Sequence, residues 1–301
     1  MNELKRAQAL ELPSREQTLN REHSVQRFWH TNKDILSKAW KQWEHSERSN
    51  LVNPTLSILD LKLKEAVETA WRDPEQEHLL KELIHEVSPG VYRFQMFDVE
   101  ELIKLRAYLK MVENSGIPLR APYGIVLNRK GYMLDPRSEG YLAAPSFQSF
   151  YRSLIDLYMR PIARLLYPEI TGYDTQSFGF SITYQPEKDT SIRMHTDASS
   201  VTLNVNLNLA NEQFTGSELD FHDQFSGELN RVSFGPGSAV IHRGNTPHKA
   251  LPIKSGERTN FVLWLYGNHM RIPRINSLKK EIDPKLRWSL SEAALDEYAP
   301  F

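Results

Sequence analysis

The chain has 301 residues, of which 40% are hydrophobic and 25% charged, values typical of a globular protein with a sizeable core. Its formal net charge is −1, which argues against a general affinity for nucleic acid or an anionic membrane. It contains no cysteine, which excludes disulfides, Cys-ligated zinc or iron–sulfur centres and a thiol nucleophile, so any metal must be bound by nitrogen and oxygen. Because no run of about 18 apolar residues occurs and the first residues lack the apolar stretch of a signal peptide, we expect a cytoplasmic protein without a membrane span.

The first 170 residues are expected to be mainly helical. Apolar residues recur at three-to-four spacing from Val25 to Trp43, and similar amphipathic patterns cover 59–71, 75–87, 98–112 and 145–166. Asp98 is expected to cap its helix, with Glu101 completing a capping box, and Pro161 is expected to kink or break the last helix. The segment 123–135 reads as an irregular strand or loop.

From residue 177 the pattern changes to short β-rich runs separated by Gly, Pro, Asn and Asp. Eight strands are predicted, over 177–184, 191–196, 200–209, 217–222, 228–234, 238–243, 248–254 and 258–267. Short strands at this spacing are typical of a two-sheet jelly roll. We therefore predict an α+β fold: a helical N-terminal region (1–170), a double-stranded β-helix or jelly-roll core (171–270) and a C-terminal tail with a short helix (271–301).

One predicted strand carries information about a site as well as about the fold. Residues 202–209 alternate strictly, with Thr and Asn on one face and Leu and Val on the other. In isolation such a strand is most often a surface strand with its polar face in water. Because this one begins five residues after Asp197, we expect Asn204 and Asn206 to line a polar cavity and the aliphatic face to pack under the N-terminal helices.

The segment His195-Thr196-Asp197 suggests half of a metal site. Residues i and i+2 of a strand share a face, so an imidazole and a carboxylate lie side by side. Such a pair alone occurs by chance in many chains. A histidine from a distant strand would complete two histidines and one carboxylate, the set that binds non-haem Fe(II) and leaves positions open. His248 and His242 are rival candidates for this third ligand.

The spacing between His248 and Arg258 suits a ligand bound between them. Residues 247–264 are predicted to form a hairpin around the turn 254–257, which places Arg258 on the order of 15 Å from the level of His248 at ~3.3 Å per residue. A buried arginine is costly without a partner. A five-carbon diacid bound to the metal would span most of this gap and supply that partner.

The segment 184–267 resembles the core of the 2-oxoglutarate- and Fe(II)-dependent oxygenases, and most closely their prolyl and procollagen-lysyl hydroxylase branch. Residues 195–208 are similar to the lysyl-hydroxylase strand pair, and 237–244 match the strand that leads to the distal histidine. Residues 214–221 are similar to a Gly-Gly-Xaa-Leu-Xaa-Phe element of that branch. Ser217 replaces the second glycine of this element, a departure that places little chemistry in doubt. A weaker resemblance is seen at 123–127.

The resemblance implies a role for each candidate residue. His195, Asp197 and His248 would bind Fe(II), with His248 preferred because it has the arginine at the family offset. Arg258 would pair bidentately with the distal carboxylate of 2-oxoglutarate. Further co-substrate contacts are implied for Tyr184, which has a core aromatic as its equal alternative, and for Asn204 and Asn206. Candidates to support the ligands or touch substrate are His242, Asn260 and Trp264.

The implied reaction is hydroxylation of an unactivated C–H bond, with O2 as a substrate, succinate and CO2 as co-products, and ascorbate in a supporting role. Asp197 argues for hydroxylation, because halogenating relatives have a small residue in its place. The branch favours an amino-acid side chain, free or in a peptide, over another small molecule, and no nucleic acid is expected as a partner.

Two further readings stay open: a cupin-type metal enzyme that does not use 2-oxoglutarate, and a catalytically silent binding module. The helical region either covers the barrel mouth or forms a homodimer interface.

Overall fold

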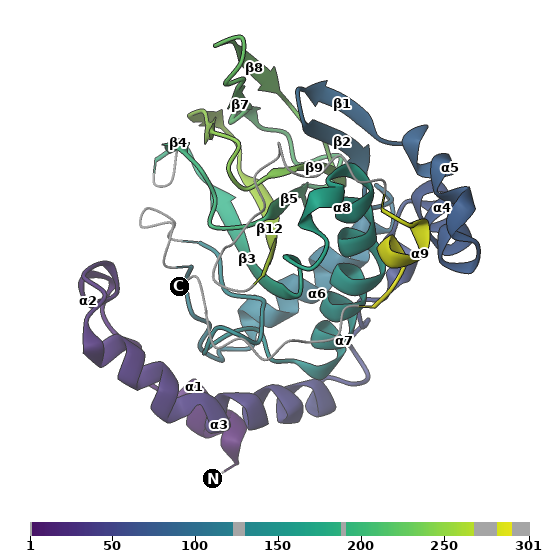
Figure 1. Ribbon diagram of the computed structural model, residues 1–301. Coiled ribbons are helices and arrows are strands. Elements are labelled where there is room, and N and C mark those ends of the chain that lie inside the picture. Colours follow the sequence, from purple (N-terminus) through teal and green to yellow (C-terminus); the bar gives the residue numbers. More distant parts are fainter. Residues whose placement is uncertain (1, 123–129, 188–190, 268–281, 291–301) are drawn as a thin grey trace.

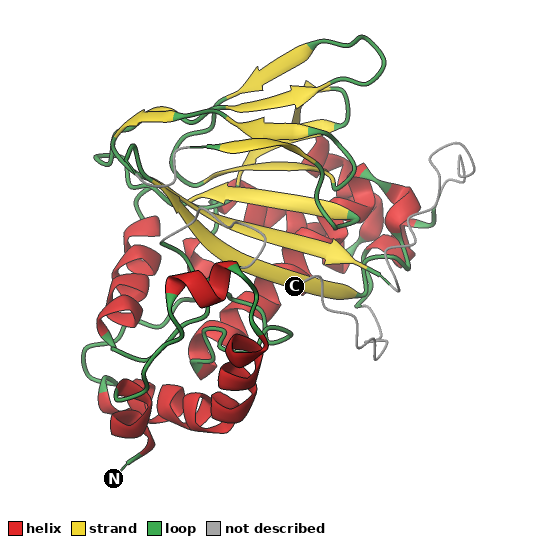
Figure 2. Ribbon diagram, turned by 90° about the vertical axis from the view of Figure 1, so that its left-hand side faces the viewer, coloured by secondary structure: helices red, strands yellow, loops and turns green. Residues whose placement is uncertain are grey.

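Two antiparallel β-sheets pack against each other, and helices cover the outer face of the larger one (Figures 1 and 2). The computed structural model describes residues 2–122, 130–187, 191–267 and 282–290. The large sheet has the strand order β1-β2-β9-β5-β12-β3, the small sheet has the order β4-β10-β7-β8, and β11 and β6 form a separate ladder. This arrangement is the predicted α+β fold with a double-stranded β-helix core.

The strands are β1 (His85–Ser88), β2 (Val91–Gln95), β3 (Gln176–Tyr184), β4 (Ile192–His195), β5 (Val201–Asn206), β6 (Thr215–Gly216), β7 (Leu219–His222), β8 (Leu229–Val232), β9 (Ser238–Arg243), β10 (His248–Ala250), β11 (Ile253–Ser255) and β12 (Arg258–Tyr266). The helices are α1 (Glu3–Gln8), α2 (Arg15–Leu19), α3 (His23–Ser46), η1 (Leu56–Ile58), α4 (Leu61–Arg72), η2 (Pro74–Glu77), α5 (His78–Lys81), α6 (Leu102–Asn114), α7 (Pro145–Leu154), η3 (Ile155–Met159), α8 (Arg160–Leu166), η4 (Pro168–Ile170) and α9 (Pro284–Arg287). No helix within these described parts is long and apolar enough to cross a membrane.

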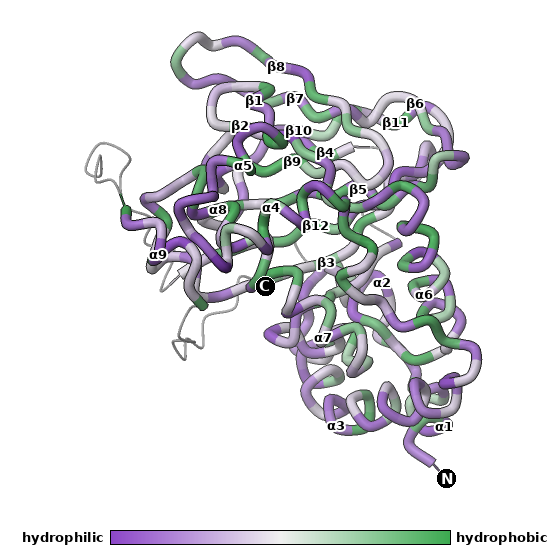
Figure 3. Tube along the Cα trace, turned by 90° about the vertical axis from the view of Figure 1, so that its right-hand side faces the viewer, coloured by the Kyte–Doolittle hydropathy of each residue, from purple (hydrophilic) through white to green (hydrophobic). Residues whose placement is uncertain are grey.

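The amphipathic patterns form helices as predicted in most of the N-terminal region. In α3 the apolar residues from Val25 to Trp43 are buried on one face, and Figure 3 shows hydrophilic and hydrophobic stretches alternating along this helix. The α6 helix begins at Leu102, and the Asp98 carboxylate accepts hydrogen bonds from the backbone N–H groups of residues 100 and 101. Asp98 therefore caps the turn before the helix, but the expected capping box with Glu101 does not form.

The helix predicted over 75–87 is wrong. Only residues 74–81 are helical, and residues 85–88 form β1, which pairs with β2. The β2 strand in turn pairs with β9, so two strands from the region expected to be helical extend the large sheet. So short an edge segment gives too few residues to distinguish a strand from an amphipathic helix in sequence.

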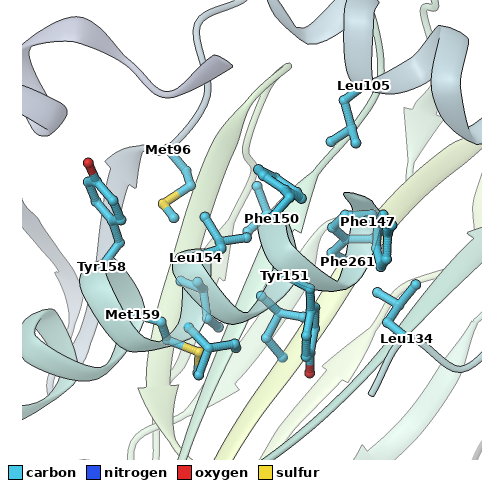
Figure 4. Packing of buried hydrophobic residues seen from close by; sticks show 14 of the residues in the cluster. Met96, Leu105, Leu134, Phe147, Phe150, Tyr151, Leu154, Tyr158, Met159 and Phe261 are labelled. Atoms are coloured by element: carbon cyan, nitrogen blue, oxygen red, sulfur yellow. The ribbon is translucent and has the colours of Figure 1, made fainter. Parts of the chain in front are cut away.

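The helix predicted over 145–166 is interrupted as expected from Pro161. A π-helical turn, η3, separates α7 from α8 and ends two residues before this proline. Proline lacks the N–H that would continue the hydrogen-bond ladder, so the widened turn accommodates it. Figure 4 shows α7 side chains packed towards the sheet, and the Phe147 ring lies 6.3 Å from that of Phe261 on β12.

The core has two parts, one on each face of the large sheet. Leu203, Val205 and Leu207 on β5 and its extension belong to the cluster shared with the helices, which confirms that the aliphatic face of this strand packs under the N-terminal region. The second cluster fills the space between the two sheets, with Phe180 and Trp264 from the large sheet and Phe221 from the small one. The polar face of β5 therefore points into the barrel.

The hairpin predicted over 247–264 does not form. The β10 strand pairs with β4 and β7 in the small sheet, whereas β12 pairs with β3 and β5 in the large sheet. The intervening β11 strand pairs with β6. The chain crosses from one sheet to the other between His248 and Arg258, so their separation is set by the packing of the sheets and not by one ladder.

The other strand predictions are close to the structure, except that the strand predicted over 217–222 begins only at Leu219 and 248–254 is divided into β10 and β11. Residues 130–134 run beside β3 through hydrogen bonds at Lys130, Tyr132 and Leu134. The weak resemblance at 123–127 lies outside the described residues. Within the C-terminal tail the described part includes the expected short helix, α9.

Candidate metal and co-substrate site

The three predicted metal ligands come together at one end of the small sheet. His195 closes β4 and His248 opens β10, and the two residues are paired across the ladder. Asp197 lies two residues beyond β4, with Oδ1 at 3.4 Å from His195 Nε2 and Oδ2 at 3.8 Å from His248 Nε2. The potential ligand atoms of all three residues lie within 4.8 Å of one another.

Backbone carbonyls fix the orientation of both imidazoles. His195 Nδ1 lies 2.8 Å from the carbonyl oxygen of Arg193, and His248 Nδ1 lies 3.0 Å from that of Thr246. Because a carbonyl oxygen only accepts, each Nδ1 carries the proton, and each Nε2 presents its lone pair to the shared centre. This orientation by a backbone acceptor is the arrangement that metal-binding histidines require.

Asp197 is held as a carboxylate by its surroundings. The Thr202 hydroxyl donates to its Oδ2 at 2.6 Å, and its backbone N–H donates to the Gly244 carbonyl at 2.8 Å. Burial alone would raise the pKa of Asp197, but the surrounding imidazoles and the Thr202 hydroxyl lower it to about 2. Burial lowers the pKa of His248, which keeps that imidazole neutral. Both states are those needed to bind a cation.

His242, the rival third ligand, lies behind the triad. Its ring centroid is 4.5 Å from that of His248, and its Nδ1 donates to the Arg243 carbonyl at 2.8 Å. The residue is buried, and burial lowers the pKa of His242 to about 3. It is not in the group of potential metal ligands found among the described residues. Its contact with His248 gives it a supporting place beside a ligand.

A cavity of about 610 Å³ opens beside the triad. The side chains that line it are mainly apolar and come from both sheets: Pro122, Phe180, Ile182, Tyr184, Ser191, Ile192, Arg193, His195, Thr196, Asp197, Ala198, Thr202, Asn204, Leu219, His248, Ala250, Val262 and Trp264. Its size is that of a typical small-molecule site. The described walls thus leave room for a ligand beside the potential metal ligands.

Arg258 is the first residue of β12 and is not among the residues that line the triad cavity. It faces its ladder partner Tyr184, with the guanidinium carbon 4.5 Å from the centre of that ring. Tyr184 lines the triad cavity, whereas Arg258 lines a second cavity of about 460 Å³, so the two cavities approach each other at this pair. Arg258 is 1% exposed, and its Nε and Nη2 donate no hydrogen bond to any residue in the described part of the chain.

The remaining predicted residues are placed as follows. Asn204 lines the triad cavity and its Oδ1 accepts a hydrogen bond from Asn260 Nδ2 at 2.6 Å, so Asn260 holds Asn204 in place. Trp264 also lines the cavity. Asn206 does not line the triad cavity: it is fully buried, its Nδ2 donates to the Phe234 carbonyl and its Oδ1 accepts from the Asn208 N–H. This amide is used to join segments of the barrel.

Thr202 and Gly244 were not among the predicted site residues. Thr202 shares the polar face of β5 with Asn204, and this alternation was the signal that could have identified it. A Cβ atom on Gly244 would lie 1.9 Å from the Ser199 carbonyl oxygen, so glycine permits the close approach of the loop that carries Asp197. Sequence spacing gives no sign of such a long-range contact.

These residues fit an Fe(II) ion with bound 2-oxoglutarate. Two imidazoles and one carboxylate are the ligand set of non-haem Fe(II) sites, and the triad lines the cavity. Ser217, whose carbonyl accepts a hydrogen bond from Arg258, lies two residues before β7, and Phe221 of that strand is the ladder partner of His248. Arg258 is thus joined to the segment that leads into the strand beside His248.

Comparison with known proteins supports this assignment. The chain is 32% identical over 206 residues to the 2-oxoglutarate and iron-dependent oxygenase domain-containing protein 2 of Xenopus tropicalis, which covers 65% of this chain and 54% of that protein. It is 31% identical over 198 residues to the 2-oxoglutarate and iron-dependent oxygenase domain-containing protein ICU11 of Arabidopsis thaliana, with 61% and 47% covered. It is 28% identical over 133 residues to human procollagen-lysine,2-oxoglutarate 5-dioxygenase 2, with 42% and 17% covered.

The comparisons with family models and with solved structures are less informative about the family of this chain. No family model matches the chain. A solved prolyl-4-hydroxylase structure from Pseudomonas putida has a TM-score of 0.43 and 16% identity, with 60% of this chain and 93% of that chain covered. The chain spans about half the length of the first two relatives. The curated relatives, together with the His-Asp-His triad, support the assignment of the chain to the 2-oxoglutarate- and Fe(II)-dependent oxygenase superfamily.

Proposed function

We propose that this protein is a dioxygenase that uses Fe(II), 2-oxoglutarate and O2 to hydroxylate an unactivated C–H bond of an amino-acid side chain, free or within a peptide or protein. Succinate and CO2 are the co-products. The observation that carries the proposal is the pairing of the triad with Arg258. The triad offers the ligands of an Fe(II) ion, and the buried guanidinium of Arg258 has unused donors and lies against Tyr184, which lines the triad cavity.

Each part of the site has a distinct task in this reaction. Bound iron supplies the oxidising chemistry, with 2-oxoglutarate as the source of two electrons. His195, Asp197 and His248 hold the ion from one side, which leaves its other side open to the cavity. Arg258 orients the co-substrate through a bidentate ion pair, which a planar guanidinium forms better than an ammonium group. Phe180 and Trp264 on the opposite wall exclude water from the reacting C–H bond.

The cavity lining favours an uncharged substrate group. Among the described residues that line it, Asp197 is the only acid, and this carboxylate is assigned to the metal. A lysine or arginine side chain would lose its hydration there without gaining a second carboxylate, which is costly. The human relative is named for procollagen lysine. We infer that the present protein also prefers an amino-acid side chain but acts on a neutral one.

We also propose that two copies of the chain form a homodimer through the helical region.

Formation of succinate tests the proposal. Purified protein is supplied with Fe(II), 2-oxoglutarate and O2, and succinate is measured for the wild type and for Asp197→Ala and Arg258→Ala. We expect iron-dependent succinate from the wild type, little from Asp197→Ala, and a raised 2-oxoglutarate requirement for Arg258→Ala. The exposed Asp223, replaced by alanine, serves as the control.

The same assay separates the alternatives. If turnover of an oxidisable substrate continued without 2-oxoglutarate and was unaffected by Arg258→Ala, a cupin-type metal enzyme would replace the proposal. If the iron-loaded wild type formed no succinate with any of a panel of free amino acids and peptides, a silent binding module would be favoured.

A further inference from the structure

Ser217 has a backbone conformation that serine rarely adopts. Its φ is +62°, and among the described residues other than glycine only Arg21 also has a positive φ. A side chain in this left-handed region crowds the backbone, and glycine is the residue that occupies it without strain. Arg21 is exposed at a helix end, but Ser217 is completely buried inside the barrel. Non-glycine residues held in such conformations are concentrated at functional sites.

The side chain of Ser217 is also unsatisfied. Its Oγ is buried and forms no hydrogen bond with any residue that the structure describes. A buried hydroxyl without a partner is unfavourable, so this serine has two costs where a glycine would have neither. Nothing in the described protein surroundings compensates for them. A ligand that accepts a hydrogen bond from the hydroxyl would.

Arg258 contacts the backbone of the same serine. Its Nη1 donates to the Ser217 carbonyl oxygen, and both side chains line the second cavity. The other donors of the guanidinium, Nε and Nη2, are buried without a hydrogen-bond partner in the described structure. Burial lowers the pKa of Arg258, whereas Tyr184 and Glu218 favour its charged form. Three donor atoms without a partner among the described residues, Ser217 Oγ and the Nε and Nη2 atoms of Arg258, thus belong to two residues in contact.

We propose that the Ser217 hydroxyl and Arg258 together bind the distal carboxylate of 2-oxoglutarate. A carboxylate has about four lone-pair positions on two oxygens and is able to accept from the guanidinium and from the hydroxyl at the same time. The strained, unsatisfied serine is then explained by the ligand, because a carboxylate in the cavity that Ser217 and Arg258 both line would accept a hydrogen bond from Oγ. This inference rests on the proposed function and adds a second co-substrate residue to it.

Opposite effects on stability and on binding distinguish this role from a structural one. In Ser217→Gly the hydroxyl is lost and the left-handed conformation becomes unstrained. We expect its unliganded melting temperature to be equal to or above that of the wild type, while its dissociation constant for 2-oxoglutarate rises about tenfold, as for a lost hydrogen bond to a charged group. Ser217→Ala should lose the same affinity without the gain in stability. A folded protein is therefore obtained with at least one of the two variants.

The binding experiment uses full-length protein loaded with Mn(II) under anaerobic conditions, titrated calorimetrically with 2-oxoglutarate and with 2-oxobutyrate. The second compound keeps the keto-acid end but has no distal carboxylate. The variants should bind 2-oxobutyrate as the wild type does. Ser233→Ala, which removes an exposed hydroxyl from the same cavity, and Arg21→Gly, which relieves the other positive φ, are the controls for binding and for stability.

Three results would overturn the assignment. The first is unchanged 2-oxoglutarate affinity in Ser217→Gly and Ser217→Ala while Arg258→Ala binds weakly, which would leave the proposed function intact. The second is phosphate binding that depends on Ser217 and Arg258 but is not displaced by 2-oxoglutarate, which would assign these donors to a separate anion. The third is a Mn(II)-loaded wild type that does not bind 2-oxoglutarate at all, which would remove the proposed function as well.

Discussion

The replacement of Thr202 by valine tests how the carboxylate ligand is positioned. The Thr202 hydroxyl lies 2.6 Å from Asp197 Oδ2 and 2.9 Å from the Ser199 hydroxyl, and Thr202 is 1% exposed. An ionised carboxylate only accepts hydrogen bonds, so Thr202 donates to Asp197 and Ser199 donates to Thr202. With Oδ2 bound in this way, Oδ1 is left for the metal. Valine keeps the branched shape of threonine and removes both hydrogen bonds.

The expected loss follows from the chemistry of this contact. A hydrogen bond to a charged group contributes about 1.5–3 kcal/mol, and groups that orient metal ligands typically account for about 10–100-fold in metal affinity. We therefore expect Thr202→Val to bind Co(II) about 10–100-fold more weakly than the wild type. Thr202→Ser keeps the hydroxyl and should retain most of the affinity.

The measurement is an anaerobic titration of metal-free protein with Co(II) against a competing chelator, with circular dichroism to establish that each variant is folded. The visible spectrum of bound Co(II) adds a second readout, because a displaced carboxylate alters the ligand field. A folded Thr202→Val protein with the affinity and spectrum of the wild type would refute the positioning role. Ser226→Ala, which removes an exposed hydroxyl from another aspartate, Asp223, is the matched control.

Three further predictions concern stability. Arg164→Met should destabilise the protein by about 3–5 kcal/mol in urea unfolding, because it leaves the fully buried Asp174 without its 2.6 Å ion pair. Lys64→Met, at a more exposed pair, is the control and should change the free energy of unfolding by less than about 0.5 kcal/mol. Similar values for the two variants would contradict the argument. Gly179→Ala should lower stability by about 1–3 kcal/mol, since its Cβ would lie 2.5 Å from the Tyr151 hydroxyl, and an unchanged melting temperature would show that this tyrosine moves freely. Mn(II) at 100 times its dissociation constant should stabilise the wild type by about 2.7 kcal/mol but not His248→Ala, and equal shifts for both would place the metal elsewhere.

Features that depend on neighbouring residues in sequence were predicted well. The alternation in 202–209 correctly assigned the face of β5 that packs under the helices and the face that carries Asn204 into the cavity. The i, i+2 spacing correctly predicted that His195 and Asp197 lie together, although Asp197 lies two residues beyond the end of β4. These inferences hold because the side-chain period of a strand is fixed by its backbone geometry.

Features that depend on the crossing between sheets were not predicted. Residues 247–264 have the pattern of a hairpin, but β10 and β12 each find other partners, because every strand of the barrel has competing neighbours of similar character. The same limit applies to β1, whose partner β2 joins β9 from more than 140 residues away in sequence. The buried hydroxyl of Ser217 was equally invisible, since its strain and missing partner exist only in three dimensions.

The division of the site between the sheets explains how one fold combines two binding tasks. His195 and His248 are ladder partners in the small sheet, whereas Asp197 is held by the hydroxyl of Thr202 on β5 of the large sheet. Arg258 and Tyr184 are ladder partners in the large sheet. In the proposed function, the distance that 2-oxoglutarate spans from the metal to Arg258 therefore depends on the side chains packed between the sheets, among them Trp264. Because close-packed interiors tolerate little change in volume, this packing would restrict the length of the co-substrate.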